Sequence, residues 1–303
     1  MAAKLSPGPG VSLILNADDF GYTPEVNRGI AECVEAGAIR SVSMMANLPG
    51  FDDACERLRE GLPVSLGAHL NFTLGRPVLP PREVQPLLSR RGSFLGPFPM
   101  AGRLLRRAAP LQCIEREARA QIERILSAQP ARLWHLDVHH HLHAFPRLLE
   151  LLIPLVTEYR IPAVRTPREQ WMWKVEGGGP PWKSLALRLF ARRAHARILA
   201  AGLKAPDALY AAVLTSSRDF ARTLLSVIRS LGPGSSEIAL HPGYSSPVLE
   251  RMDSYHLQRE GELRALLGER VREALRARDL RLISYRDLAE SPPRVFSAEG
   301  RPR

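Results

Sequence analysis

An apolar run that ends in two adjacent carboxylates is the feature that most constrains this fold. Residues 11–15 are mainly apolar and predict a strand that is buried on both faces. Asp18 and Asp19 follow, and Gly21 permits the positive φ with which a chain leaves a sheet. Thr23, followed directly by proline, is typical of a helix start. The carboxylates are therefore expected at the carboxyl end of a strand, where α/β folds place their chemistry. The alternative is that one caps the helix and the other is solvated.

Strand-like and helix-like segments alternate along most of the chain. Further strand patterns occupy residues 41–46, 64–72, 133–138, 163–167, 208–214, 237–240 and 281–285. Helical patterns occupy residues 24–36, 51–60, 114–128, 146–159, 219–231 and 257–277. This alternation predicts an α/β fold in which about seven parallel strands form a barrel.

Two long segments interrupt the alternation. Residues 73–110 are rich in Pro, Gly and Arg, and a connection of this length in a compact domain is usually functional. Residues 168–207 contain a Gly-Pro hinge and a basic helix, and we expect them to form a lid or a surface helix. Residues 1–290 are otherwise predicted to form one domain, and residues 291–303 a flexible tail.

The basic helix at residues 183–204 carries an apolar stripe at helical spacing. The stripe consists of Leu187, Phe190, Ala191, Ala194 and Ile198, and another face carries Arg188, Arg192 and His195. We favour a helix that covers the barrel. Contact with a membrane surface or an anionic substrate is the alternative, and a homodimer is possible with either.

Composition narrows the class of protein. The chain has 303 residues, of which 45% are hydrophobic, and a formal net charge of +11, which favours anionic partners without choosing among them. Cys33, Cys55 and Cys113 form no CxxC pair and are expected to be free thiols. The first ten residues have no apolar signal-peptide core, and no apolar run has the ~20 residues that a membrane span needs. We therefore expect a cytoplasmic protein.

Polar residues recur where the predicted strands end. They are Asp18, Asp19, His69, His139, Arg165 and His241. Because the carboxyl ends of parallel strands meet at one mouth of a barrel, these side chains are expected to lie together. One Asp and two His from separate strands can hold one face of a metal and leave positions open for water and substrate. Singly, His69 could be a core histidine, Arg165 a surface arginine, and His241 part of a turn.

Four histidines lie within residues 139–143. Buried imidazoles in such number are costly unless something binds them, so a chance cluster on a solvated loop is the weaker alternative. We expect His140, His141 and His143 to support the site rather than to ligate a metal. Asp137 is expected to orient an imidazole, and His135 to pack in the core.

Four motifs together resemble the YdjC-like carbohydrate deacetylases, which include chitooligosaccharide deacetylase and a branch associated with hopanoid biosynthesis. They are Asn16–Gly21, Gly67–Leu70, Asp137–His143 with Phe145-Pro146, and His241–Tyr244. The resemblance implies a NodB-like, distorted (β/α) barrel and one divalent metal, Mg or Zn. It also implies that Asp19, His69 and His139 bind the metal and that Asp18 is the base.

The function expected from this resemblance is removal of an acetyl group from an N-acetylated sugar, chitooligosaccharide-like or a glycolipid, by metal-activated water. Asp18 would accept the proton of the water, helped by Arg165 if the two pair, and His241 could protonate the departing amine. No nucleophilic cysteine or GxSxG motif suggests a covalent route.

Other readings stay open. One is another metal-dependent hydrolase such as a phosphoesterase, and another is a deacetylase of the hopanoid pathway. A basic binding protein for nucleic acid or membranes ranks last, because the arginines are dispersed whereas the acids and histidines are concentrated.

Overall fold

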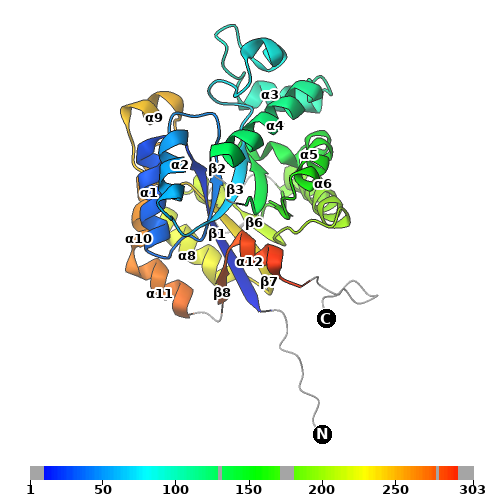
Figure 1. Cartoon of the computed structure of the whole chain (residues 1–303). Coiled ribbons are helices and arrows are strands. Elements are labelled where there is room, and N and C mark those ends of the chain that lie inside the picture. Colours follow the sequence, from blue (N-terminus) through cyan, green and yellow to red (C-terminus); the bar gives the residue numbers. More distant parts are fainter. Residues whose placement is uncertain (1–9, 129–131, 171–180, 278–279, 293–303) are drawn as a thin grey trace.

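The computed structural model describes residues 10–128, 132–170, 181–277 and 280–292, and these residues form one curled parallel sheet surrounded by helices (Figure 1). The strands are β1 (Val11–Phe20), β2 (Ser41–Met44), β3 (Ser65–Leu70), β4 (His135–Val138), β5 (Ala163–Val164), β6 (Ala208–Tyr210), β7 (Gly234–Leu240) and β8 (Leu280–Ile283). Their order is β5-β4-β3-β2-β1-β7-β6, and β8 pairs with the first half of β1.

The two ends of this sheet curl toward each other. Just after β5, Glu169 forms an isolated parallel bridge with Leu209 of β6. The N–H of Gln170 donates to the carbonyl of Leu209 over 2.8 Å, and the N–H of Leu209 donates to the carbonyl of Arg168 over 3.0 Å. Because an isolated bridge rather than a ladder joins these edges, the barrel is distorted. The predicted α/β fold is confirmed, with β8 as a short strand beyond the seven on the main path.

The larger helices pack around the outside of the sheet (Figure 1). They are α1 (Pro24–Glu35), α2 (Phe51–Arg59), α3 (Pro97–Leu105), α4 (Leu111–Ala128), α5 (Pro146–Glu158), α6 (Pro181–Ala200), α8 (Phe220–Ser230), α10 (Leu257–Leu267) and α11 (Glu269–Ala277). Shorter helices are α7 (Ala212–Thr215), α9 (Pro247–Met252) and α12 (Tyr285–Glu290), with the 3-10 helices η1 (Pro81–Glu83), η2 (Gln85–Leu87) and η3 (His139–Ala144).

The side chains of β1 alternate between two environments, as the two-residue period of a strand requires. Leu13, Leu15 and Ala17 belong to the main core. Ile14 instead packs with residues of β5, β8 and α12. Asn16 and Asp18 continue along that inner side, where Asn16 donates to Ser43 of the neighbouring β2 and Asp18 accepts from Arg165, which follows β5. The inside of the barrel is therefore apolar at one end and polar toward the carboxyl ends of the strands.

Several predicted element boundaries were wrong. The predicted strand 208–214 is β6 followed by α7, and the predicted helix 257–277 is two helices separated at Gly268. Residues 73–110 are not an open loop, because they contain η1, η2 and α3. The helix start at Thr23 is confirmed, since its side chain accepts a hydrogen bond from the N–H of Val26.

The basic helix α6 covers the barrel in part as predicted. Ala194 and Ile198 are buried. The placement of His195 apart from the buried face was wrong, because its side chain is buried and its Nδ1 lies 3.0 Å from the hydroxyl of Thr166. Residues 171–180, with the Gly-Pro hinge, and residues 293–303 of the predicted tail lie outside the described residues. Within the described part of the chain, every helix is too short or too polar to cross a bilayer.

Candidate metal centre and active site

Three side chains from three strand ends meet at the mouth of the barrel. Asp19 is the last residue but one of β1, His69 lies near the end of β3, and His139 directly follows β4. Asp19 Oδ1 lies 3.5 Å from His69 Nε2 and 3.4 Å from His139 Nδ1, and the two ring nitrogens are 3.2 Å apart. Asp19 Oδ1 is buried and accepts no hydrogen bond from a described residue. One carboxylate oxygen and two imidazole nitrogens that converge in this way are a suitable donor set for a divalent metal.

The backbone turns Asp19 toward this cluster. Asp19 has a φ of 67°, in the left-handed region that non-glycine residues rarely adopt. Such a conformation persists only where the surroundings enforce it, and it is common at functional sites. Gly21 completes the exit from the sheet with a φ of 97°, as the sequence predicted.

The second oxygen of Asp19 is held by an arginine from the far end of the chain. Arg259 Nη2 of α10 lies 2.7 Å from Asp19 Oδ2 and 2.9 Å from Asp253 Oδ2. Burial alone would raise the pKa of Asp19, but the Arg259 guanidinium and His139 bring it well below its ordinary value. Asp19 is therefore an anion with one oxygen fixed by the protein and the other left for a cation.

Asp137 orients His69, as the sequence predicted. Asp137 Oδ2 lies 2.9 Å from His69 Nδ1, so His69 Nε2 faces Asp19 and the cluster. A carboxylate behind a histidine in this position fixes the ring and increases the basicity of the free nitrogen. Gly67, two residues earlier, is needed because a Cβ there would lie 2.1 Å from the ring of His135.

Asp18 points the other way, into a buried ion-pair network. Both oxygens of Asp18 accept hydrogen bonds from Arg165, over 2.6 and 2.8 Å. Arg165 is fully buried and also pairs with Glu237 over 2.8 Å and with Asp137. Burial alone would raise the pKa of Asp18, but Arg165 lowers it below its ordinary value. Asp18 is hence ionised, and its engaged oxygens make it a weaker candidate for a metal ligand than Asp19.

His241 directly follows β7 and lies beside Asp18. His241 Nε2 is 3.9 Å from Asp18 Oδ2, and His241 Nδ1 is 3.8 Å from Glu262 Oε1. Glu262 also accepts the hydroxyl of Tyr255 and the backbone N–H of His241, both over 2.7 Å. Burial alone would lower the pKa of His241, but Glu262 raises it above the ordinary value, which favours an imidazolium.

The remaining histidines of the cluster lie around His139. His140 and His141 both have left-handed backbone, with φ of 57° and 52°, and His140 Nδ1 is 2.9 Å from the hydroxyl of Thr73. Burial lowers the pKa of His140, His141 and His143 to about 3, so all three are neutral. His135 packs in the interior as predicted, with its ring stacked on Tyr285.

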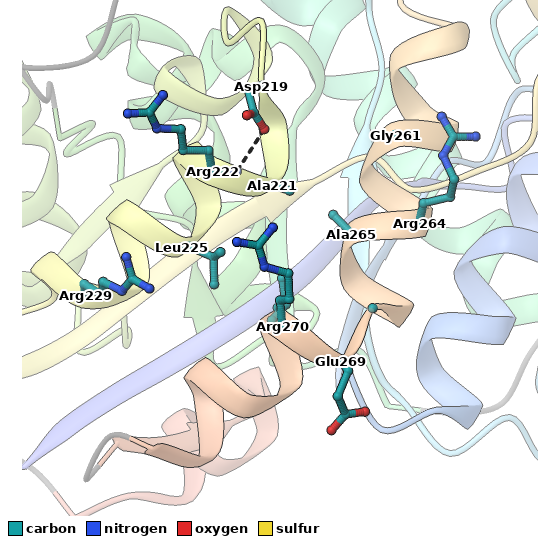
Figure 2. A pocket seen from close by; sticks show the side chains of 12 residues that line it. Asp219, Ala221, Arg222, Leu225, Arg229, Gly261, Arg264, Ala265, Glu269 and Arg270 are labelled. Atoms are coloured by element: carbon teal, nitrogen blue, oxygen red, sulfur yellow. Dashed lines mark hydrogen bonds between the residues drawn. The ribbon is translucent and has the colours of Figure 1, made fainter.

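A cavity of about 240 Å³ opens onto the two carboxylates. Most of the side chains of the site line this cavity. They are Asp18, Asp19, His69, His139, His140, His141, His241, Asp253, Tyr255 and Arg259. Ala211, Ala212 and Thr215 add a small, mostly apolar wall. A larger groove of about 740 Å³ lies elsewhere, between α8, α10 and α11, and is lined by Arg222, Arg229, Arg264 and Arg270 (Figure 2). That groove has no histidine in its lining, so the acid–base and metal chemistry belongs to the smaller cavity.

The comparison with known proteins agrees with this geometry. The model of the family described as YdjC-like protein matches residues 12–277. The chain belongs to the YdjC-like family. This membership, predicted from the four motifs, is confirmed together with the fold.

Similar proteins are carbohydrate deacetylases. The carbohydrate deacetylase of Thermoanaerobacter pseudethanolicus is 30% identical over 90% of this chain and 97% of its own length. That of Geobacillus stearothermophilus is 31% identical over 90% of this chain and 96% of its own. A crystal structure from Enterococcus faecalis V583, of a protein whose proposed activity is cleavage of cellobiose-phosphate, has 25% identity and a TM-score of 0.74, and the match covers 92% of this chain and 99% of that one.

The structure brings all six predicted site residues to one place, Asp18, Asp19, His69, His139, Arg165 and His241. Sequence reasoning missed five side chains that hold them: Glu237, Asp253, Tyr255, Arg259 and Glu262. Glu237 is the first residue of a predicted strand, 237–240, and a charged residue directly before an apolar run was an available signal. The other four lie near or within a charged helix, where nothing local distinguishes them from solvated residues.

Proposed function

We propose that this chain is a metal-dependent carbohydrate N-deacetylase. One observation carries the proposal: the converging Asp19, His69 and His139 lie beside an ionised Asp18 and the imidazole of His241, and one cavity reaches all of them. This arrangement supports hydrolysis by water, with separate groups for metal binding, proton acceptance and proton donation. The names of the relatives support an acetylated sugar as the substrate.

In the proposed site, Asp19, His69 and His139 hold one divalent ion. When bound there, such an ion lowers the pKa of water and polarises the acetyl carbonyl group. We keep zinc and magnesium as candidates, and two imidazole ligands favour zinc. Arg259 and Asp137 keep the ligands in place from behind, because each is hydrogen-bonded to a ligand atom that faces away from the cluster.

Asp18 is the proposed base. Arg165 keeps it ionised. Oδ1 accepts hydrogen bonds from Arg165 and Asn16, whereas Oδ2 accepts one described hydrogen bond, from Arg165, and keeps a lone pair that can accept a proton from the attacking water. Bond formation between the water oxygen and the acetyl carbon then precedes cleavage of the C–N bond. Arg165 would act by fixing the orientation of Asp18, since it is buried behind that side chain.

His241 is the proposed acid. Glu262 favours its protonated form, and His241 lines the same cavity as Asp18 and His139. Transfer of its proton to the departing nitrogen gives an amino sugar and acetate. Since residues from β1, β3, β4, β7 and α10 all contribute to the site, we propose that residues 1–290 act as one domain.

Acetate release tests this function. N-acetylglucosamine, its β-1,4-linked oligomers and an N-acetylglucosamine-bearing glycolipid should be incubated with the protein, with added Zn²⁺ or Mg²⁺ and with a chelator. We expect acetate with metal and none after chelation. His139→Ala should abolish both metal uptake and acetate release, whereas His256→Ala, outside the cavity, should change neither. Phosphate release from sugar phosphates without acetate release would replace this proposal with a phosphoesterase.

A further inference from the structure

Helix α3 presents an apolar stripe to solvent. Phe98 and Leu105, seven residues apart, are 88% and 70% exposed, and the partly exposed Ala101 and Gly102 lie between them on the same helical face. The opposite face, with Met100 and Leu104, is buried in the core and anchors the helix. The helix is therefore well packed against the protein, and the apolar stripe is exposed on its outer face.

The segment that contains α3 has an unusual charge balance. Residues 73–110 contain seven arginines and a single acid, Glu83, with no lysine or aspartate. The arginines are Arg76, Arg82, Arg90, Arg91, Arg103, Arg106 and Arg107. Glu83 is already paired with Arg116 of α4. With seven arginines and one acid, this segment carries a net charge of +6, which is more than half of the +11 of the chain. None of the seven arginines forms an ion pair with a described carboxylate.

The segment lies beside the mouth of the barrel. Its first residue, Thr73, bonds to His140, which lines the cavity. Its last turn is fixed by Arg147 at the start of α5, which donates a 3.0 Å hydrogen bond to the carbonyl of Arg107. Figure 1 shows α3 and the neighbouring loops projecting beyond the carboxyl ends of the strands. A surface that contacts α3 would thus lie on the same side of the molecule as the cavity.

We propose that α3 is an interfacial helix that docks the protein on an anionic lipid bilayer. An exposed Phe and Leu can enter the boundary between headgroups and acyl chains, while surrounding arginines contact lipid phosphates. Charge complementarity argues for this occupant, because arginines that have no described carboxylate partner, around an apolar stripe, fit an anionic membrane better than a second copy of this basic chain. The surface is independent of the proposed catalytic residues.

Vesicle co-sedimentation tests the proposal with the full chain. Phosphatidylcholine vesicles with and without 30% phosphatidylglycerol serve as probes at low and high salt. We expect binding only to the anionic vesicles, and loss of most binding in high salt. Phe98→Ser with Leu105→Ser should weaken binding at least tenfold. Arg103→Gln, Arg106→Gln and Arg107→Gln together should weaken it by roughly fivefold for each charge removed.

Two matched variants control for composition. Leu257→Ser removes an apolar residue of α10 that is 63% exposed, and Arg218→Gln, Arg222→Gln and Arg229→Gln together remove three exposed charges at α8. Both should bind vesicles nearly like wild type, and thermal denaturation should show that every variant is folded. Equal losses from the α3 and α8 charge variants would overturn the proposal, since binding would then follow total charge. A change from dimer to monomer in Phe98→Ser with Leu105→Ser would also overturn it and assign the stripe to self-association.

Discussion

Arg165 holds Asp18 through both carboxylate oxygens, with Nη2–Oδ1 and Nη1–Oδ2 separations of 2.6 and 2.8 Å. The same guanidinium pairs with Asp137 and Glu237 in a fully buried position. Asp18 and Asp19 are neighbours in the chain, but each has its own arginine, Arg165 and Arg259. The two carboxylates therefore have different surroundings. Each can be changed separately, so separate roles can be tested.

Exchange of each carboxylate for an amide should separate metal binding from proton transfer. Asp19→Asn removes the anionic oxygen of the metal cluster, so metal content and activity should fall together. Asp18→Asn keeps the shape but cannot accept a proton, so the metal should stay while turnover falls by roughly 10²–10⁴. Elemental analysis and acetate release on both variants are the measurements. Metal loss in Asp18→Asn with retention in Asp19→Asn would mean that the roles are exchanged.

Removal of the buried guanidinium should destabilise the protein. Arg165→Gln leaves Asp18, Asp137 and Glu237 without their shared cation in the interior, and such changes cost about 3–5 kcal/mol. Denaturant unfolding measures the loss. Arg264→Gln removes an arginine whose side chain is 74% exposed and should cost well under 1 kcal/mol. A loss of the same small size for both variants would show that the network contributes little.

Glu262 should control the alkaline limb of the activity profile. His241 must be protonated to act as an acid, and Glu262 raises its pKa. Glu262→Gln removes this effect, so the pKa of His241 falls and activity is lost at a lower pH than in wild type. The acidic limb, set by Asp18, should move little. The measurement is kcat/KM against pH for wild type, Glu262→Gln and the surface control Glu290→Gln, and an unmoved alkaline limb in Glu262→Gln argues against His241 as the acid.

Glu169 should make stability depend on pH. Burial raises its pKa from 4.5 to about 7, although the N–H groups of Ala211 and Ala212 donate to it. Because the folded state binds this proton more tightly than the unfolded chain, its contribution is fully present below pH 4.5 and is lost as pH rises to about 7. The loss amounts to at most about 3 kcal/mol. Glu169→Gln keeps an acceptor without a charge.

The free energy of unfolding of wild type and Glu169→Gln, measured at pH 5 and pH 7.5, tests this effect. Other titrating groups are the same in both proteins, so the difference between their pH dependences reports on Glu169. We expect wild type to lose more stability over this range than the variant. Parallel pH dependences would show that Glu169 is ionised in the folded protein at both pH values.

Local sequence patterns were sufficient to predict the strands and helices and the residues proposed to bind the metal. Apolar runs of strand length, each followed by a polar residue, predicted β1, β3, β4 and β7 and placed Asp19, His69 and His139 at strand ends. Parallel strands bring their carboxyl ends to one edge, so the convergence of these residues followed from the alternation of strands and helices. The sequence also predicted that Asp137 orients an imidazole, but the structure identified His69 as its partner, because parallel β3 and β4 place the two residues in register.

The tertiary structure alone decided how the charges are paired. Arg259 reaches Asp19 across 240 positions of sequence, and Glu262 reaches His241 from the same helix, which reads locally as an ordinary charged helix. The left-handed backbone of Asp19, which turns it away from Arg165, likewise depends on surrounding packing. The spacing of apolar residues within one helix or strand indicates which of its faces is buried, and this spacing can be read from that segment alone. Pairing of buried charges depends on distances between elements, and these exist only once the barrel has formed.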